Sequence, residues 1–376
     1  MKKVSLYIHI PFCIQKCLYC DFPSYSAKEE LMTNYVMSLT KEIDNLPKIK
    51  VDTIFIGGGT PTYLSFRNWK IIKISIDKLD KNEEIEFTVE GNPGTFKKET
   101  LELLKAMGVN RLSIGLQAAQ DSLLRILGRI HSFEEFKESY TLARKCGFKN
   151  INVDIMFGLP NQLLEDSVET AAQVIKLKPE HISCYGLIIE KGTPFYKMQQ
   201  ENKLTLPSEE LEREMYDVSK NMLEESGYHQ YEISNFSRKG FECKHNLVYW
   251  NLGEYIGCGS GAHSYIDGKR LRNSDSIEEY ISVMKNSNSG TIEKHENSIE
   301  DNMEEFMFMG LRKIDGIYEE DFNKRFNRDI NSVYEKIINK YINKGLLHRE
   351  KRRIFLSRRG IEISNSVMCD FILEKK

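Results

Sequence analysis

Hydrophobic and polar positions follow two alternating rhythms in the first half of the chain. Short runs rich in β-branched and aromatic residues predict strands, and longer stretches with apolar residues three or four positions apart predict helices. The strands are expected at 5–10, 51–57, 85–90, 111–116, 150–158 and 181–187. The helices are expected at 29–44, 68–79, 97–108, 120–127, 133–147 and 164–177. The alternation predicts an α/β fold with parallel strands, and six units favour a partial, open (β/α)6 barrel over a closed barrel of eight units.

The pattern changes after about residue 200. A charged helix is expected at 207–227 and a strand-like stretch at 228–237, and the polar residues 283–302 predict a linker. Helices at 300–316, 329–347 and 358–374 and a hairpin at 346–357 then predict a smaller C-terminal α+β, winged-helix-like domain. We therefore expect three domains, at 1–200, 201–295 and 296–376.

Composition narrows the class of protein. The 376 residues are 40% hydrophobic with a formal net charge of -2, which gives no global attraction toward nucleic acid or anionic membrane. The N-terminal stretch is interrupted by His9 and Pro11 and does not resemble a signal peptide, and no run approaches 18 apolar residues. The eight cysteines are not spaced like a secreted disulfide scaffold. We expect a protein of the reducing cytoplasm, where clustered thiols are metal ligands.

The chemistry that stands out is a group of three cysteines after the first strand. Cys13, Cys17 and Cys20 follow a C-x3-C-x2-C spacing. Three thiolates can hold three corners of a [4Fe–4S] cube and leave one iron without a protein ligand. That iron could be chelated by the amino and carboxylate groups of S-adenosylmethionine (SAM), whose C–S bond is cleaved by one electron in radical chemistry.

Other uses of these cysteines fit less well. Cys17 and Cys20 alone could form a redox CxxC pair, but Cys13 would then be unexplained. A zinc ion would need a fourth ligand, for which His9 and Asp21 are candidates. Haem attachment through C-x-x-C-H fails, because Asp21 stands where histidine is required.

Polar or glycine-rich segments follow or end the next strands. The loop GGGTP, 57–61, lets the backbone approach a ligand closely, although it could also be a plain tight turn. Glu90 follows the third strand, Gln117 the fourth, and Asp154 lies on the fifth. Loops after parallel strands meet at one end of the sheet, so we expect these groups to lie together with the cysteines.

These residues resemble the radical SAM superfamily, and within it the oxygen-independent coproporphyrinogen III oxidase group. The motifs YIHIPFC, GGGTPT, E-x-NP, RLSIGLQ and D-x-M-x-GLP occur in order, and the resemblance covers nearly the whole chain. It implies that Cys13, Cys17 and Cys20 ligate a [4Fe–4S] cluster. The resemblance also implies SAM pockets lined by Tyr7, Tyr19, Gly58, Gly59, Thr60, Glu90, Gln117, Arg129 and Asp154.

Two branches of this group differ in their motifs. The oxidases resemble C-x3-C-x2-C-x-C, and this chain has Phe22 at the place of the fourth cysteine. Residues 245–250, HNLVYW, instead match the H-N-x-x-Y-W signature of the haem chaperone branch, the HemW proteins, and 254–265 is also typical of it. The resemblance implies that 201–295 is the extension that carries this motif.

Haem needs an apolar slot, an axial donor and cations for its propionates. His245 with Tyr249 and Trp250 would supply a donor and two aromatic faces, and Cys243 and His263 are reserve donors. The residues alone favour a buried or surface histidine beside two core rings over a haem ligand. The resemblance moves the interpretation toward haem, with His245 as the expected ligand.

The resemblance therefore implies a haem chaperone that binds haem, a [4Fe–4S] cluster and SAM, and delivers haem to respiratory proteins. No catalytic residue is assigned, although the machinery for SAM cleavage is present; the alternative is a radical oxidase of coproporphyrinogen III. Expected partners are haem and haem-requiring client proteins, without nucleic acid, and a homodimer is left open. We expect a cytoplasmic location that allows contact with the inner face of the membrane.

Two other stretches have ordinary interpretations. The methionines of 302–312 recur at helical spacing, which predicts a core face rather than a haem surface. The basic cluster at 348–359 is expected to be a solvated hairpin tip rather than a DNA-binding site.

Overall fold

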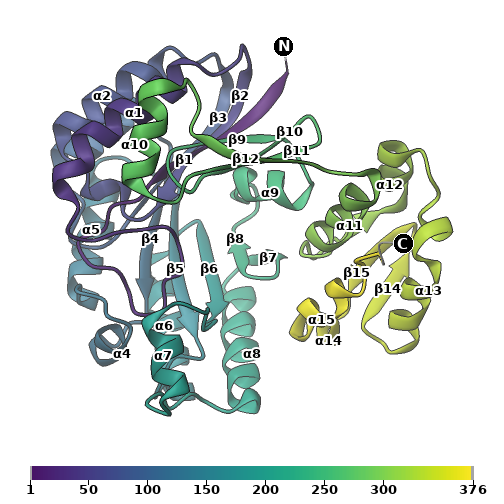
Figure 1. Ribbon diagram of the computed structural model, residues 1–376. Coiled ribbons are helices and arrows are strands. Elements are labelled where there is room, and N and C mark those ends of the chain that lie inside the picture. Colours follow the sequence, from purple (N-terminus) through teal and green to yellow (C-terminus); the bar gives the residue numbers. More distant parts are fainter. Residues whose placement is uncertain (1, 374–376) are drawn as a thin grey trace.

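The computed structural model describes residues 2–373, and its centre is a run of six parallel strands that alternate with helices (Figure 1). The parallel strands are β1 (Lys3–Ile10), β2 (Lys50–Gly58), β3 (Lys81–Gly91), β4 (Arg111–Gln117), β5 (Ile151–Phe157) and β6 (His181–Gly186). The helices between them are α1 (Met32–Asp44), α2 (Phe66–Asp77), α3 (Lys98–Ala106), α4 (Asp121–Ile126), α5 (Phe133–Lys145) and α6 (Leu164–Leu177), with short 3-10 turns at Glu29–Leu31 and Pro61–Tyr63. The strand–helix repeats expected from the sequence are therefore present.

The sheet continues beyond both edges of this parallel core. Its order is β12-β11-β10-β9-β1-β2-β3-β4-β5-β6-β8-β7, so it stays open, as expected for a partial barrel. Only β9 among the added strands pairs in parallel, with β1; the other added pairs are antiparallel. The added elements are α7 (Pro194–Gln200), α8 (Glu209–Glu225), β7 (His229–Glu232), β8 (Asn235–Ser237), α9 (Lys244–Trp250), β9 (Tyr255–Cys258), β10 (His263–Ile266), β11 (Lys269–Asn273), α10 (Ile277–Asn286) and β12 (Thr291–Glu296).

The C-terminal residues form a smaller α+β unit beside the large sheet, at the right in Figure 1. Its antiparallel sheet has the order β13-β15-β14. Its elements are α11 (Ile299–Gly310), β13 (Ile317–Tyr318), α12 (Glu319–Phe326), α13 (Ile330–Asn343), β14 (Leu347–Glu350), β15 (Arg353–Leu356), α14 (Arg358–Glu362) and α15 (Ser364–Cys369). Met303 and Met307 are fully buried in its own hydrophobic core, which confirms the prediction that these methionines form a core face.

Two predictions in this half of the chain were wrong. The supposed linker 283–302 includes the end of α10, the strand β12 and the start of α11, because β12 pairs with β11 as an exposed edge strand that needs few apolar residues. The expected last helix is two short helices, α14 and α15, separated at Ile363; residue 374 lies outside the described residues. The division into three domains at 200 and 296 stays a prediction.

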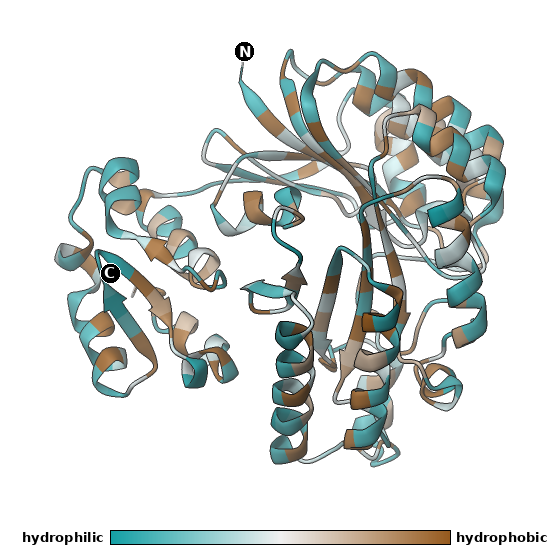
Figure 2. Ribbon diagram, turned by 180° about the vertical axis from the view of Figure 1, so that it is seen from behind, coloured by the Kyte–Doolittle hydropathy of each residue, from teal (hydrophilic) through white to brown (hydrophobic). Residues whose placement is uncertain are grey.

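The strands of the parallel core separate apolar and polar side chains onto opposite faces. In β4, Leu112, Ile114 and Leu116 belong to buried apolar positions, and the intervening positions are Arg111, Ser113, Gly115 and Gln117. Figure 2 shows the resulting bands of opposite hydropathy along the strands. Side chains in a strand point alternately to the two faces, so one face of the sheet is polar although it is turned toward the inside of the barrel.

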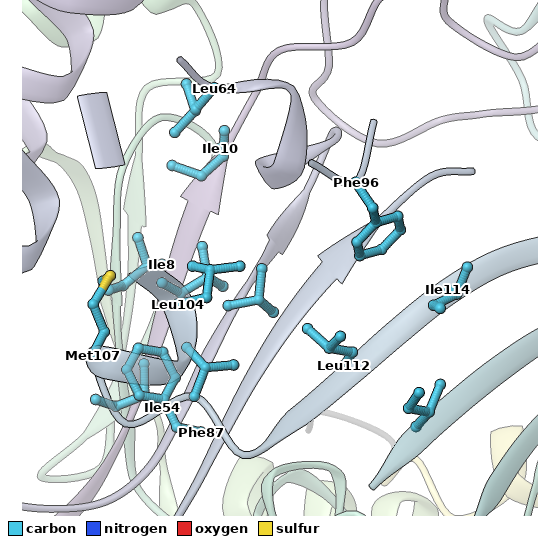
Figure 3. Close-up of a cluster of buried hydrophobic side chains, with 14 of the residues drawn as sticks. Ile8, Ile10, Ile54, Leu64, Phe87, Phe96, Leu104, Met107, Leu112 and Ile114 are labelled. Carbon is cyan, nitrogen blue, oxygen red and sulfur yellow. The ribbon is translucent and has the colours of Figure 1, made fainter. Parts of the chain in front are cut away.

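The apolar face packs under the helices. Figure 3 shows side chains from neighbouring strands meeting side chains at the end of α3. These residues are Ile8, Ile54, Phe87 and Leu112 from the strands and Leu104 and Met107 from α3 and its C-cap. The helices thus bury the hydrophobic layer, and the inner face of the sheet remains available for polar side chains and ligands.

Candidate functional site

The cysteine segment after β1 is fixed by backbone hydrogen bonds. The Cys13 N–H donates to the Tyr25 carbonyl at 2.9 Å, and the Tyr25 N–H donates to the Pro11 carbonyl at 2.7 Å. The Thr60 N–H of the glycine-rich loop donates to the Phe12 carbonyl at 2.8 Å. Farther along, the Leu18 N–H donates to the carbonyl of Leu127, after α4, at 3.0 Å. Three separate parts of the chain therefore hold this segment in place.

All three cysteines are free and line one cavity of about 530 Å³. Cys13 is buried, and Cys17 and Cys20 are half-buried. Their sulfur atoms have polar neighbours: Thr60 Oγ1 donates to Cys13 Sγ at 3.5 Å, and Arg129 Nη1 donates to Cys17 Sγ at 3.3 Å. Hydroxyl and guanidinium donors of this kind stabilise thiolates, the form of cysteine that binds metal.

The donor set fits a cluster better than a single ion. Within residues 2–373, no three His, Cys, Asp or Glu side chains converge closely enough to hold one metal ion. In a cubane each cysteine binds a different iron atom, so three spaced sulfur atoms are what a [4Fe–4S] cluster needs. The zinc alternative is weaker, because His9 hydrogen-bonds Tyr7 through Nδ1 and the Pro23 carbonyl through Nε2, both at 2.9 Å.

Most of the residues predicted for SAM lie around the same cavity. The lining includes the cysteines together with Tyr19, Gly58, Gly59, Glu90, Gln117, Arg129 and Asp154. Tyr7 does not line it; its ring stacks on Phe55 at 6.3 Å between centroids. Thr60 also does not line the cavity. Its hydroxyl contacts the lining residue Cys13 and accepts a hydrogen bond from Asn92 Nδ2 at 2.8 Å. Both residues contact side chains that line the cavity, Phe55 and Cys13 respectively.

The glycines of the loop after β2 leave room for side chains of the site. A Cβ on Gly57 would lie 2.6 Å from Glu90 Oε2, and a Cβ on Gly59 would lie 2.8 Å from the Phe12 carbonyl oxygen. Gly58 has φ of 108°, and a Cβ there would meet the His9 ring. This segment is more than a plain tight turn, because each glycine permits a separate close approach.

Two carboxyl groups face the cavity from β3 and β5. The pKa of Glu90 is raised to about 7, with burial as the largest cause and the charge of Asp154 as the second. The Gly58 N–H, which donates to Glu90 Oε2 at 3.1 Å, opposes the shift. Burial also raises the pKa of Asp154, against hydrogen bonds that include Asn152 Nδ2 at 2.7 Å. Both groups can accept hydrogen bonds from hydroxyl or ammonium groups of a ligand.

Arg129 joins the cysteine segment to the strand ends. Besides Cys17, its guanidinium donates to Asn92 Oδ1 at 3.0 Å and to the Gly115 carbonyl oxygen. Gln117, at the end of β4, has φ of 77°, which is unusual for a residue other than glycine, and its Oε1 accepts from the Tyr185 hydroxyl at 3.1 Å. Strained backbone of this kind is commonly found where a side chain must be aimed at a ligand.

The predicted haem ligand His245 lies outside this cavity. Its residue is 1% exposed, its ring stacks on Phe55 with 5.2 Å between centroids, and burial lowers its pKa to about 3. Nδ1 hydrogen-bonds Thr53 Oγ1 at 2.7 Å, and Nε2 hydrogen-bonds the Tyr249 hydroxyl at 2.8 Å. Both ring nitrogens are therefore engaged in this conformation.

The two other candidate haem ligands, Cys243 and His263, differ in how far they are exposed to solvent. The Cys243 thiol is fully buried and donates to Glu86 Oε1 at 3.5 Å. His263, by contrast, is an exposed residue on β10. Trp250 lies away from His245 in a second cavity of about 570 Å³, between α9 and the C-terminal unit, which Lys313 and Arg325 also line.

Sequence reasoning missed several residues that line the cavity. Arg111, Asn152, Ser183, Tyr185 and Asn246 all border it. The signal was the polar residue at every second position of strands with otherwise apolar sequence, such as R-L-S-I-G-L-Q. A period of two identifies which side chains share a face, and only the fold shows that this face lines a cavity.

Comparison with known proteins agrees with this geometry. The model of the radical SAM superfamily matches residues 7–174, and that of the HemN C-terminal domain matches 298–363. The solved coproporphyrinogen III oxidase HemN of Escherichia coli has a TM-score of 0.86 at 21% identity, covering 100% of this chain and 91% of its own, and confirms the fold. None of the helices in the described part of the chain has the length and apolar character to span a membrane.

Similarity in sequence extends over nearly the whole chain. The heme chaperone HemW of Bacillus subtilis (strain 168) is 39% identical over 98% of this chain and 99% of its own length. The heme chaperone HemW of Lactococcus lactis subsp. lactis (strain IL1403) is 36% identical over 99% and 98%. This chain therefore belongs to the HemW family of radical SAM proteins.

Proposed function

We propose that this protein is a haem chaperone that binds a [4Fe–4S] cluster and SAM in the cavity of the partial barrel. The observation that carries the proposal is the convergence of three free cysteines, the glycine-rich loop and two carboxyl groups on one cavity. The haem part rests on the relatives of similar length, which are named heme chaperones.

The residues of this chain have distinct roles in the proposed site. Cys13, Cys17 and Cys20 hold the cluster, which supplies one-electron chemistry and an iron open to SAM. Arg129 places a positive charge beside Cys17 and is suited to a ligand carboxylate. Glu90 accepts hydrogen bonds from ligand hydroxyl or ammonium groups, and the glycine loop lets backbone groups approach the ligand.

The cluster is tested by anaerobic reconstitution followed by iron and sulfide analysis and EPR with and without SAM. We expect about four iron and four sulfide per chain, and a SAM-dependent change in the EPR spectrum. Cys17→Ser should lose the cluster, and Cys369→Ser, a control at an exposed cysteine, should keep it. Stoichiometric zinc without sulfide would contradict the proposal.

The alternative function is radical oxidation of coproporphyrinogen III. Phe22, at the place of the oxidases' fourth cysteine, is 60% exposed at the rim of the cavity, so no thiol stands there. Incubation of the reconstituted protein with SAM, a reductant and coproporphyrinogen III should give no protoporphyrinogen IX. Stoichiometric conversion would replace the chaperone by the oxidase.

Haem ligation by His245 remains our proposal, and it requires one of the ring nitrogens to be released. The Thr53 hydroxyl donates its proton to Ser5 Oγ at 2.8 Å, so His245 Nδ1 carries the proton in the Thr53 contact. Nε2 then holds the lone pair, which accepts from the Tyr249 hydroxyl. Haem iron must compete with this hydroxyl for Nε2.

A haem titration followed by the Soret band separates these roles. Tyr249→Phe frees the lone pair and should strengthen haem binding several-fold, His245→Gln should abolish the Soret shift, and His263→Gln should change neither. If only His263→Gln removes the shift, the exposed histidine is the donor and His245 has a structural role.

We further propose that haem passes to haem-requiring respiratory proteins at the inner face of the membrane. This part rests on the resemblance alone. Anaerobic crosslinking of the haem-loaded protein in cells, followed by identification of the captured chains, tests it and also detects a homodimer. Capture of membrane haem proteins by the loaded form but not by the haem-free form is the expected result.

A further inference from the structure

Arg111, at the start of β4, is a buried cation without a partner. The residue is 2% exposed, and it borders the cavity. Among residues 2–373 nothing forms a hydrogen bond or ion pair with its guanidinium, and Nε is both buried and unsatisfied. Burial disfavours the charged guanidinium, but nearby acidic groups, among them Glu86 and Asp154, favour it through space and raise the pKa of Arg111. The charge is therefore retained without any direct hydrogen-bond partner.

The nearby carboxylates are occupied elsewhere. The two oxygens of Glu86 accept the backbone N–H groups of Lys244 and His245 at 2.9 and 3.0 Å, at the start of α9. Asp154 accepts from Asn152 Nδ2 at 2.7 Å and from Ser113 Oγ at 3.2 Å. Neither acid approaches the guanidinium within ion-pair distance, although both influence it through space.

Arg111 lies apart from the residues that are predicted to bind SAM. Strand register places Arg111 beside Thr88 and Ser113 beside Glu90, so Arg111 lies deeper in the barrel than Glu90. Gln117 is at the other end of β4, about 20 Å away at the usual rise of a strand. The carboxylate is the only anionic group of SAM, and in the proposed site it lies at the cluster end, where Arg129 stands.

We propose that Arg111 is the anchor of a second subsite, deep in the cavity, that binds the carboxylate of a ligand other than SAM. A guanidinium pairs with a carboxylate through two parallel hydrogen bonds, which is the interaction that Arg111 lacks. The neutral amide of Asn246 borders the same space and can complete the binding of an anionic group. The neighbouring Asn152 and Ser183 already donate their side-chain protons, to Ser113 and Asp154 and to Asn152 Oδ1. The inference goes beyond the proposed haem function and does not require it.

The carboxylate has two possible sources, a free small organic acid or a propionate arm of a porphyrin. Sodium propionate is the simplest probe, because it contains the shared group and nothing else. Haem and haem dimethyl ester then distinguish the sources, since the ester keeps the ring and lacks the charge.

The first experiment measures thermal unfolding of the reconstituted protein in propionate and in chloride at equal ionic strength. Wild type should unfold at a higher temperature in propionate, Arg111→Gln should lose this difference, and Arg111→Lys should keep part of it. Without ligand, Arg111→Gln should unfold close to wild type, because the substitution breaks no hydrogen bond or ion pair. Arg270→Gln is the control: it breaks an ion pair with Glu305, so it should lower the unfolding temperature and leave the response to propionate intact.

Three results would overturn the inference. Arg111 is a structural counter-ion if Arg111→Gln unfolds early, as Arg270→Gln does, and still responds to propionate. It belongs to the SAM site if Arg111→Gln weakens SAM binding at least tenfold. There is no carboxylate site if propionate and chloride act alike on wild type. If wild type does not bind haem at all, in contrast, the chaperone proposal is refuted. The unfolding temperatures in propionate and in chloride still test the carboxylate subsite.

Comparison of haem with its dimethyl ester identifies which ligand supplies the carboxylate. If wild type binds haem at least tenfold more tightly than its dimethyl ester, and Arg111→Gln removes that preference, the propionate arm occupies the subsite. If haem and ester bind alike while the propionate effect depends on Arg111, the subsite takes a free acid.

Discussion

Replacing Glu90 by glutamine should change how the stability of the protein depends on pH. Glu90 has a pKa of about 7 in the folded protein, against 4.5 for an ordinary glutamate, and burial is the largest cause. Between these values the unfolded chain releases a proton that the folded chain retains. The folded state therefore binds more protons, and wild-type stability falls as pH rises from 4.5 through 7.

The size of the effect follows from the shift. A difference of 2.5 pKa units corresponds to about 3 kcal/mol in the free energy of unfolding. The carboxyl borders an open cavity and is half-buried, so water reduces the penalty, and we expect about 1–3 kcal/mol. Glutamine retains an oxygen for the Gly58 N–H and cannot ionise. The variant should match wild type near pH 4.5 and exceed it by this amount at pH 8.

Urea unfolding of the cluster-free protein, followed by circular dichroism at several pH values, measures the difference. Glu190→Gln is a suitable control, because Glu190 borders the same cavity and is exposed. The control should run parallel to wild type at every pH. If the Glu90→Gln curve is also parallel to wild type, the Glu90 carboxyl ionises freely in the folded protein, and burial does not raise its pKa.

Three further substitutions test other parts of the structure. Gly59→Ala should destabilise the protein by about 1–3 kcal/mol and lower its iron content after reconstitution, because the new Cβ meets the Phe12 carbonyl that supports the cysteine segment. Ile114→Ala, on the apolar face of β4, should cost about 2–5 kcal/mol in urea unfolding, with SAM binding retained. Glu42→Ala should cost more than about 3 kcal/mol by the same measurement, since the buried carboxylate accepts from Gly259 N, Gly290 N, Asn273 Nδ2 and Tyr280 Oη.

The parallel core could be predicted because each unit has a strong local pattern. The strand RLSIGLQ has the two-residue period of a strand, and the helix FEEFKESYTLARK has the period of an amphipathic helix. The right-handed connection between parallel strands then fixes how such units are arranged. The strands added beside β1 lacked such a signal. β12 is almost wholly exposed, and the Gly290 N–H just before it donates to Glu42, a residue distant in the sequence.

The site was predictable to the extent that its residues follow strands. The cysteine spacing, the strand-end positions of Glu90 and Gln117 and the place of Asp154 on the fifth strand predicted that these residues are neighbours, and the structure brings them to one cavity. Arg111 was not identified, because it begins a strand instead of ending one. The engagement of both nitrogens of His245 also could not be predicted, because Thr53 is distant in sequence and supplies one of the two contacts.

The separation of side chains on β3, β4 and β5 has a consequence for how this protein tolerates mutation. Substitutions at one set of alternating positions disturb packing under the helices and reduce the amount of folded protein, whereas those at the other set alter ligand binding in a chain that still accumulates. A saturation library scored for abundance and for ligand occupancy would give two profiles that oscillate out of phase along each strand. Because packing and ligand binding depend on different residues, substitutions at the cavity-facing positions can change the ligand while the helix-facing positions keep the fold stable.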